Sequence, residues 1–369
     1  MKKIIALILA LICVLSLAAC NSGNNGDNSG NGGTEIVLPD LPGGSDETEK
    51  PDESGNEELP ELPNDDDEKQ EGGNISTNTR YTANTSISDV INDPVFGNFG
   101  RMIFPVNSGY YSGSTLGNLR LTWYNNINVA HTVEMCNYFK DQTLAGNQVF
   151  YDIYTEAEKA ADPRKADTGL FFFRGRENAK FAVTCAGGGW AYVGAMHDSF
   201  PHAIELSKKG YNAFAIIYRP GAQTAYEDLA RAITFIFHYA NELGVDTSGY
   251  SVWGGSAGGR MTATISSYGV QQFDGAVGIP KPSTAIIQYT GHTDYNKDGE
   301  PATFVCVGEN DGIANYRTMK TRIDNIAAMG VPTEYHSYAG LGHGFGLGIG
   351  TIAEGWFDQA VAFWEKNGQ

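Results

Sequence analysis

Cysteine is scarce in this sequence and follows no metal-binding spacing. Five cysteines occur among 369 residues, and no Cys-x-x-Cys or Cys/His spacing typical of a zinc site is present. Apart from Cys13 and Cys20 near the start, the cysteines are Cys136, Cys185 and Cys306. Because three is an odd number and two of these lie inside apolar strand patterns, we expect buried free thiols and no metal.

Long apolar runs are also missing. The first twenty residues hold two lysines, a short apolar run from Ile4 and small residues before Cys20. This pattern is typical of a secretory signal, and the run is too short for a stable membrane span. The ending Leu17-Ala18-Ala19-Cys20 resembles the bacterial lipobox. That resemblance implies lipidation of Cys20 and an extracytoplasmic lipoprotein anchored to the bacterial membrane. The alternative is an ordinary signal peptide that ends near a chance cysteine.

Residues 21–80 contain few aromatic or β-branched residues. They carry sixteen acidic and three basic residues, a balance of −13 within the formal −18 of the whole chain. Such a segment buries too little apolar surface to offset its ordering entropy, and its like charges extend it. We expect a disordered acidic tether, with a binding role for the acidic tail as the alternative. We expect no nucleic-acid partner, and membrane contact only through the lipid anchor.

The remaining residues, 81–369, are expected to form the catalytic domain. Asn, Gly and Tyr are frequent in 81–147, where 130–140 alone has a helical pattern. This stretch is an N-terminal extension or cap, an edge of the core, or a segment packed against the sheet. From residue 149 the apolar pattern becomes regular. Strands are expected at 149–154, 169–174, 180–185, 213–218, 250–253, 285–289, 303–307 and 334–338. Helices are expected at 200–209, 226–243, 317–329 and 355–364.

This alternation predicts an α/β domain with a mostly parallel central sheet and helices on both faces. One apolar strand leads into Gly254-Gly255-Ser256-Ala257-Gly258, a Gly-x-Ser-x-Gly turn before a helix. A serine on such a turn points its hydroxyl over the end of the sheet. The next N–H, that of Ala257, is free at the helix N-terminus. With 46 glycines in the chain, the alternative is a glycine-rich loop without a catalytic role.

A second glycine cluster follows the strand at 180–185. Gly187, Gly188 and Gly189 allow backbone N–H groups to face a void near the serine. We expect Gly188 and Gly189, together with Ala257, to bind the oxygen of a tetrahedral intermediate. The alternative is a turn of no catalytic use.

The serine requires a base and a group that orients the base. In this topology both should follow the serine, the acid first, each just past a strand. Asp311 lies between a turn and Gly312 and is the better acid, with Glu309 as its rival. His343, bracketed by glycines at a strand's end, is the base. His336 lies within a strand, and His292 precedes the acid.

Four motifs in this order resemble the α/β-hydrolase carboxylesterases. The resemblance is closest to the branch with bacterial feruloyl and acetyl-xylan esterases, near the hormone-sensitive-lipase-like enzymes, and it covers about 148–369. The motifs are Gly187-Gly188-Gly189-Trp190, Gly254-Gly255-Ser256-Ala257-Gly258-Gly259, Asp311, and Gly342-His343-Gly344-Phe345-Gly346-Leu347. Tyr218-Arg219-Pro220 and Asp228 also match that branch. Ala186 and Arg260 depart from it, because relatives often have histidine at both places. The resemblance implies an α/β-hydrolase fold and no cofactor.

The predicted function is a serine carboxylesterase acting on short acyl esters, chiefly acetyl groups on carbohydrate. The ester substrate would be a small molecule or an oligosaccharide. Aromatic and amide residues flank the expected site at 123–126 and at Trp190 and Tyr192, and they suit sugar rings. We expect Trp190, Tyr192 and Phe345 to contact substrate. The alternative is that these aromatics belong to the core and that the enzyme hydrolyses small esters with broad specificity.

Two further alternatives remain. One is a peptidase of the prolyl-oligopeptidase type, although no stretch long enough for a propeller precedes the core. The other is a catalytically silent lipoprotein that binds glycan or a partner protein. Residues 294–300 also have the opening of a calcium loop, but Val305 occupies the place of its closing glutamate. We therefore expect a polar turn there and no tight calcium site.

Overall fold

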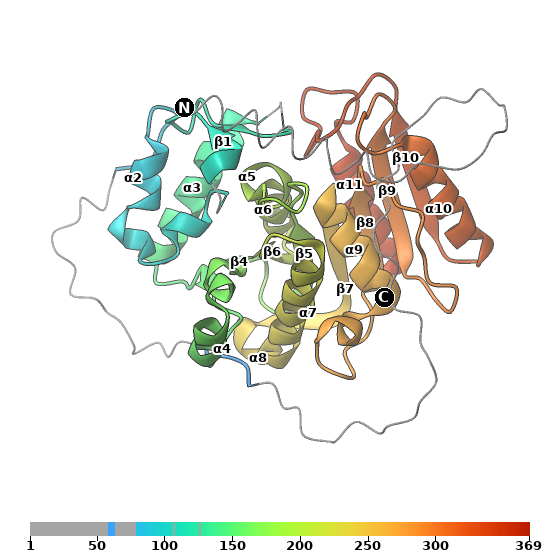
Figure 1. The fold of residues 1–369 in the computed structure, drawn as a ribbon, viewed down its shortest axis with the longest axis horizontal. Helices are drawn as coiled ribbons and strands as arrows, with labels where there is room; N and C mark the ends of the chain where they lie inside the picture. Colours follow the sequence, from blue (N-terminus) through green and yellow to red (C-terminus); the bar gives the residue numbers. More distant parts are fainter. Residues whose placement is uncertain (1–57, 63–78, 106–107, 125–126) are drawn as a thin grey trace, which may run out of the picture. The chain divides into compact units, whose positions relative to one another are not determined.

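The computed structural model describes residues 58–62, 79–105, 108–124 and 127–369, all of which fall in one unit, Glu57–Gln369. Among these residues, eight strands form the central sheet (Figure 1). The strands are β3 (Phe150–Tyr151), β4 (Gly169–Phe173), β5 (Ala179–Cys185), β6 (Asn212–Ile217), β7 (Val245–Gly255), β8 (Thr284–Gln288), β9 (Ala302–Gly308) and β10 (Thr333–Tyr338). Each overlaps one strand predicted from the sequence.

The strand order across the sheet is β10-β9-β8-β7-β5-β6-β4-β3. The pairs β3–β4 and β4–β6 are antiparallel, and every other neighbouring pair is parallel. Because parallel strands end at the same edge, the loops after β5, β7, β8, β9 and β10 meet there. The mostly parallel sheet with antiparallel strands at one side is the layout that the sequence predicts.

Helices cover both faces of the sheet. On β7, Tyr250 and Trp253 are three residues apart and point to opposite faces. Tyr250 packs against Phe237 near the end of α7, whereas Trp253 packs against Phe357 and Trp364 of α11. The helices are α2 (Ile87–Ile91), α3 (Val129–Leu144), α4 (Glu156–Ala161), α5 (Ala195–Asp198), α6 (Phe200–Lys208), α7 (Ala222–His238), α8 (Ala240–Leu243), α9 (Ala257–Tyr268), α10 (Tyr316–Ala328) and α11 (Trp356–Asn367).

The stretch 81–147, left open by the sequence, packs against the sheet. Besides α2 and α3 it contains a short antiparallel pair, β1 (Tyr111–Ser112) and β2 (Arg120–Leu121). Phe139 of α3 packs on Phe171 and Phe173 of β4 and on Phe200 of α6, with ring centroids 4.9–5.3 Å apart. The segment is therefore part of the folded domain, and within it Trp123 and Tyr124 reach the loop after β5.

Cys20, the signal sequence and most of the predicted tether lie outside the described residues. Within the tether stretch, residues 58–62 contact the domain: Arg231 donates to the Glu58 carbonyl at 2.9 Å, and the Tyr239 hydroxyl donates to the Pro60 carbonyl at 2.8 Å. In the part of the chain that the structure describes, no helix combines the length and apolarity that crossing a membrane requires. Cys136, Cys185 and Cys306 are buried free thiols, as predicted.

Candidate active site

The predicted serine lies where β7 turns into α9. Ser256 has φ +54° and ψ −120°, a left-handed backbone that costs a residue with a side chain on the order of 1–3 kcal/mol. The flanking glycines allow this turn. A Cβ on Gly254 would lie 2.3 Å from the Gly258 carbonyl oxygen, and one on Gly258 would lie 2.0 Å from the Cys185 carbonyl oxygen. Packing therefore requires glycine two residues on either side of the serine.

The structure brings Ser256, His343 and Asp311 together from three different loops. His343 Nε2 lies 2.9 Å from Ser256 Oγ, and His343 Nδ1 lies 2.7 Å from Asp311 Oδ2. The Asp311 side chain is fully buried, and its Oδ1 accepts the N–H groups of Ile313 at 2.8 Å and Ala314 at 2.7 Å. The carboxylate is thus fixed by the backbone on one side and holds the imidazole on the other.

The alternative acid and base residues from the sequence are Glu309, His336 and His292. Glu309 is exposed and accepts a hydrogen bond from Ser337 at 2.8 Å. His336 lies on β10 with its Nε2 2.6 Å from Glu334 Oε1. His292 is buried, and its Nδ1 has no hydrogen-bond partner in the described structure. Burial and the nearby Arg322 lower the pKa of His292 well below its ordinary value. None of the three is bonded to the serine.

The loop after β5, residues 186–190, is here called the glycine loop. Gly188, Gly189 and Trp190 have φ of +137°, +60° and +64°. In the described structure, the N–H groups of Gly188, Gly189 and Ala257 donate no hydrogen bond to the protein. Ala257 is the first residue of α9, where the helix dipole favours negative charge. A Cβ on Gly187 would lie 2.7 Å from the Ser256 Cβ, so the loop lies directly against the serine.

One buried carboxyl beside this loop was not identified from the sequence. Asp198, the last residue of α5, is 1% exposed. Its Oδ2 accepts the Gly187 N–H at 2.8 Å and the Tyr124 hydroxyl at 3.0 Å, and its Oδ1 accepts the Tyr289 hydroxyl. Burial raises the pKa of Asp198, while these donors and the neighbouring His197 oppose that rise. The short α5 has no periodic pattern that could have revealed it.

The glycine loop is also held by a residue that follows β6. Tyr218, which follows β6, donates its hydroxyl to the Ala186 carbonyl at 2.7 Å. The next residue, Arg219, is paired with the buried Asp228 of α7 at 2.7 Å, and Tyr154 donates to the same carboxylate at 2.7 Å. The Arg219–Asp228 pair therefore fixes the chain just past β6, from which Tyr218 reaches the glycine loop.

The aromatic residues predicted to contact substrate divide into exposed and buried groups. Tyr192 is 1% exposed and forms a three-ring cluster with Tyr110 and Trp123, whose centroids lie 5.0 and 5.8 Å from its own. Phe345 is 4% exposed and packs edge-on against Tyr289. Neighbouring aromatics cover most of both rings, so neither Tyr192 nor Phe345 presents an exposed ring face, and their contact with substrate stays a prediction.

Trp123 and Trp190 keep part of their surface open. Trp190 is partly buried and meets Tyr226 edge-on at 5.7 Å. Trp123 is 45% exposed, with its ring against the glycine loop: a Cβ on Gly189 would lie 2.9 Å from Trp123 Cζ3. A partly exposed indole thus lies beside the expected oxyanion donor Gly189 and stacks on Tyr192.

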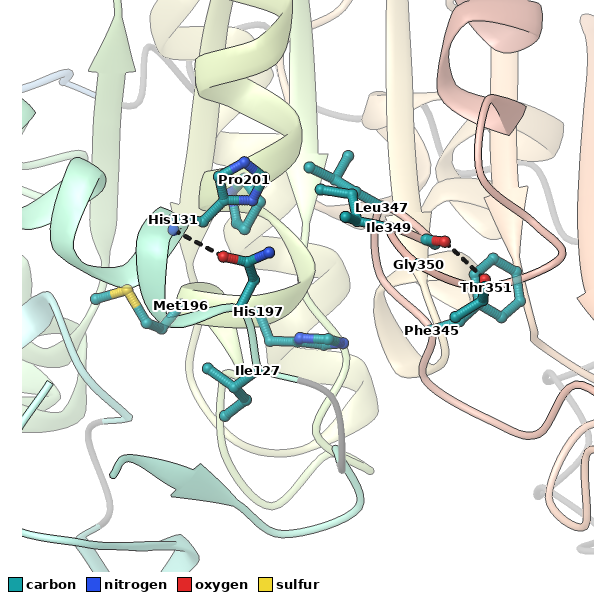
Figure 2. A pocket seen from close by; sticks show the side chains of 12 residues that line it. Ile127, His131, Met196, His197, Pro201, Phe345, Leu347, Ile349, Gly350 and Thr351 are labelled. Carbon is teal, nitrogen blue, oxygen red and sulfur yellow. Dashed lines mark hydrogen bonds between the residues drawn. The ribbon is translucent and has the colours of Figure 1, made fainter. Parts of the chain in front are cut away.

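A cavity of about 320 Å³ adjoins the loop that carries His343, residues 339–355, here called the histidine loop. Figure 2 shows side chains from the start of α3 and from α5–α6 facing side chains of the histidine loop across it. His197 lines the cavity, and its Nε2 lies 2.8 Å from the Gly344 carbonyl. The residues lining it are Ile127, Asn128, His131, Met196, His197, Pro201, Phe345, Leu347, Gly348, Ile349, Gly350 and Thr351. Ser256 is not among them, so this cavity is a neighbour of the serine site.

The calcium-like stretch 294–300 is closed by a buried ion pair. Glu300, whose side chain is fully buried, contacts Arg322 at 3.2 Å and accepts from Ser267 at 2.6 Å and from the Asn296 N–H at 2.6 Å. Arg322 also donates to the Asp294 carbonyl at 2.7 Å. A guanidinium therefore supplies positive charge to this turn.

Among the described residues, one group of side chains has a geometry that could hold a metal ion. His131, Glu134 and Glu205 present atoms within 4.8 Å of one another at a partly exposed surface. Both carboxylates are already paired with Lys208 at 2.7 Å. This group is an ordinary surface ion-pair cluster.

Comparison with known proteins supports this description of the fold. A protein-family model described as BD-FAE matches residues 173–302. The matched stretch contains the glycine loop and Ser256 and ends before Asp311 and His343. No curated protein matches the chain.

Solved structures share the architecture at low sequence identity. A thermophilic esterase, Est2, from the Planctomycetes species Thermogutta terrifontis is 19% identical in its native form, with 58% of this chain and 89% of that chain covered and a TM-score of 0.50. Its propionate-bound form is 19% identical, with 59% and 93% covered and a TM-score of 0.51. The strand order, the strained serine turn and these likenesses show that the chain has the α/β-hydrolase fold.

Proposed function

We propose that this protein is a serine carboxylesterase that removes short acyl groups, chiefly acetyl, from carbohydrate. The observation that carries the esterase assignment is the hydrogen-bonded series from Ser256 through His343 to the buried Asp311, beside backbone N–H groups that donate to no other described group. These are the parts that acyl transfer requires: a nucleophile, a base, a group that orients the base, and donors for the oxyanion.

In the proposed reaction, Ser256 Oγ attacks the ester carbonyl while His343 Nε2 takes its proton. Asp311 accepts the Nδ1–H and stabilises the imidazolium that forms. The oxygen of the tetrahedral intermediate is bound by N–H groups of Ala257, Gly188 and Gly189, and one such donor is worth about 3–4 kcal/mol of barrier. The imidazolium then protonates the leaving alcohol. Water hydrolyses the acyl-enzyme by the same steps.

The carbohydrate part of the proposal is supported by the exposed indole of Trp123 beside the glycine loop. A flat aromatic face suits a sugar ring, and stacking on Tyr192 keeps this face in place. A short acyl group is supported by the sequence, which offers no long apolar helix that could cover the site as a lid. The predicted lipid anchor at Cys20 would hold the enzyme outside the cell, where polymer fragments arrive.

A fluorophosphonate probe tests the esterase assignment. We expect it to label the wild type and to leave Ser256→Ala unlabelled. The absence of labelling in the folded wild type would favour a silent binding protein. Cleavage of prolyl peptides with no hydrolysis of esters would favour the peptidase alternative.

Acetate release from acetylated xylan and xylo-oligosaccharides, set against nitrophenyl esters of increasing chain length, tests the substrate class. We expect Trp123→Ala to raise KM for the acetylated oligosaccharide about three- to tenfold and to leave KM for nitrophenyl acetate unchanged. Leu144→Ala, which removes another exposed apolar side chain at the end of α3, serves as the control and should change neither. A strong preference for octanoyl or longer chains, with no acetate released from any glycan, would contradict the carbohydrate assignment.

A further inference from the structure

We propose that Asp198 is a positioning residue that fixes the glycine loop and the histidine loop relative to Ser256. The proposal rests on the esterase function proposed above and concerns the same site. It assigns a role to a carboxyl group that touches none of the three residues of the proposed triad. Three segments distant in sequence meet at this one side chain: the glycine loop, the end of β8, and the N-terminal segment through Tyr124.

The first step concerns the glycine loop. Asp198 Oδ2 accepts the Gly187 N–H at 2.8 Å, and the Gly187 carbonyl in turn accepts the Gly194 N–H at 2.9 Å. Gly187 is therefore held at both of its polar groups. With this peptide fixed against Ser256, the N–H groups of Gly188 and Gly189 are left without protein acceptors among the described residues. By fixing Gly187, the Asp198 carboxylate positions the N–H groups of the two residues that follow, Gly188 and Gly189.

The second step concerns the histidine loop. Tyr289, which donates its hydroxyl to Asp198 Oδ1, accepts the Gly346 N–H at 3.2 Å. Its ring meets the His343 imidazole edge-on at a centroid distance of 5.0 Å. Tyr289 has a backbone φ of +31°, which is disfavoured for a residue with a side chain. The hydroxyl bond to Asp198 helps to hold this conformation and, through it, the base.

The third step is the choice of a carboxylate. An ionised carboxylate is an acceptor at both oxygens and can take one N–H and two O–H donors at once, whereas an amide has one acceptor oxygen. Burying such a group is costly unless it is fully hydrogen-bonded. Among the described residues, the hydrogen-bond donors to the Asp198 side chain are Gly187, Tyr124 and Tyr289, and none is a lysine or arginine. This buried carboxyl group lies where the glycine loop, the end of β8 and the N-terminal segment meet.

Asp198→Asn tests the proposal in the full-length protein. We expect kcat for nitrophenyl acetate, per site titrated with fluorophosphonate, to fall on the order of 100-fold, with KM within about threefold of wild type. Oxyanion donors act mainly in the transition state, so the inhibition constant of a trifluoromethyl ketone should rise by the same factor as kcat/KM falls. Site titration excludes unfolded protein from the count.

Asp93→Asn is the matched control. Asp93 is also a largely buried carboxylate that accepts from a tyrosine, Tyr81, from a backbone N–H and from Lys140, and none of its partners belongs to the site. The Asp93→Asn variant should have a lower melting temperature, while its kcat per titrated site stays at the wild-type value. If Asp198→Asn fails to fold, the double variant Tyr124→Phe/Tyr289→Phe keeps the carboxylate and removes two of its donors. That variant should raise the ketone inhibition constant about tenfold.

The outcomes separate the two proposals. A wild type that takes no fluorophosphonate and hydrolyses no ester overturns the esterase function and this inference with it. An active wild type whose Asp198→Asn variant, or the double tyrosine variant, keeps the wild-type kcat and ketone affinity overturns the positioning role alone. The positioning role is also overturned if KM rises in either variant while kcat is unchanged.

Discussion

Replacement of Asp311 by asparagine is the sharpest test of the proposed base. In the structure Asp311 Oδ1 accepts two backbone N–H groups, at 2.8 and 2.7 Å, while Oδ2 takes one bond, from His343 Nδ1. An asparagine has one acceptor oxygen. Two buried N–H groups left unpaired would each cost about 1–3 kcal/mol, against one lost bond to the histidine. The amide oxygen therefore stays with the backbone, and the NH2 group turns toward His343.

That arrangement puts the imidazole in the wrong tautomer. An NH2 group facing Nδ1 makes Nδ1 an acceptor, so the ring proton moves to Nε2. Nε2 then points a proton at Ser256 Oγ, 2.9 Å away, and cannot accept one. We expect kcat to fall about 10⁴-fold, which corresponds to about 5.4 kcal/mol of transition-state stabilisation. The assay is nitrophenyl acetate hydrolysis per folded molecule, with folding checked by circular dichroism.

Glu309→Gln is the matched control, because it makes the same chemical change two residues away. Glu309 is exposed, and among the described residues its side chain is hydrogen-bonded only to Ser337, so we expect activity within about twofold of wild type. An Asp311→Asn variant that retains a tenth or more of wild-type activity would refute the tautomer argument. If Glu309→Gln is the more damaging change, the acid is wrongly assigned.

Four further predictions concern the serine, the base, Asp93 and calcium. Ser256→Ala should abolish fluorophosphonate labelling and lower ester hydrolysis by several orders of magnitude without changing the circular dichroism spectrum. The kcat/KM should fall at acid pH, because a protonated His343 cannot accept a proton; a rate flat from pH 5 to 8 would count against a histidine base. Burial opposes ionisation of Asp93, but hydrogen bonds from its tyrosine and lysine partners outweigh burial and lower its pKa below 3.8. The stability that Asp93 contributes is therefore present above about pH 4 and lost on acidification, and thermal melts should show a weaker acid dependence in Asp93→Asn. Calcium should not raise the melting temperature; a calcium-dependent rise that disappears in Asp294→Ala would contradict this.

The strands and the triad residues could be predicted because their signals are local. Apolar runs of four to eight residues mark the strands, and the Gly-x-Ser-x-Gly turn marks the end of β7. The carboxyl ends of parallel strands meet at one edge, so polar residues just past β9 and β10 should approach the serine. Asp311 and His343 lie where this reasoning places them: His343 is within hydrogen-bond distance of both Asp311 and Ser256.

Burial of individual aromatic side chains could not be predicted in the same way. Tyr192 and Phe345 lie in loops, where no periodicity indicates which side faces the core. Tyr192 is covered because Tyr110 and Trp123 both stack against it in a three-ring cluster. Both partners come from the N-terminal segment, about 70–80 positions earlier in the chain. Exposed or buried character in such loops depends on tertiary contacts that a single sequence does not display.

The same limit explains why the N-terminal segment had no assigned role. The family resemblance begins near residue 148, and the matched family model covers 173–302, yet the site depends on residues before either. Tyr124 donates to Asp198 at 3.0 Å, and a Cβ on Gly344 would lie 2.9 Å from the Tyr124 ring. Trp123 lies against Gly189. The sheet positions the serine, the acid and the base, whereas this segment closes the site between the glycine loop and the histidine loop. Differences in substrate between enzymes that share the sheet are therefore expected to arise in segments of this kind.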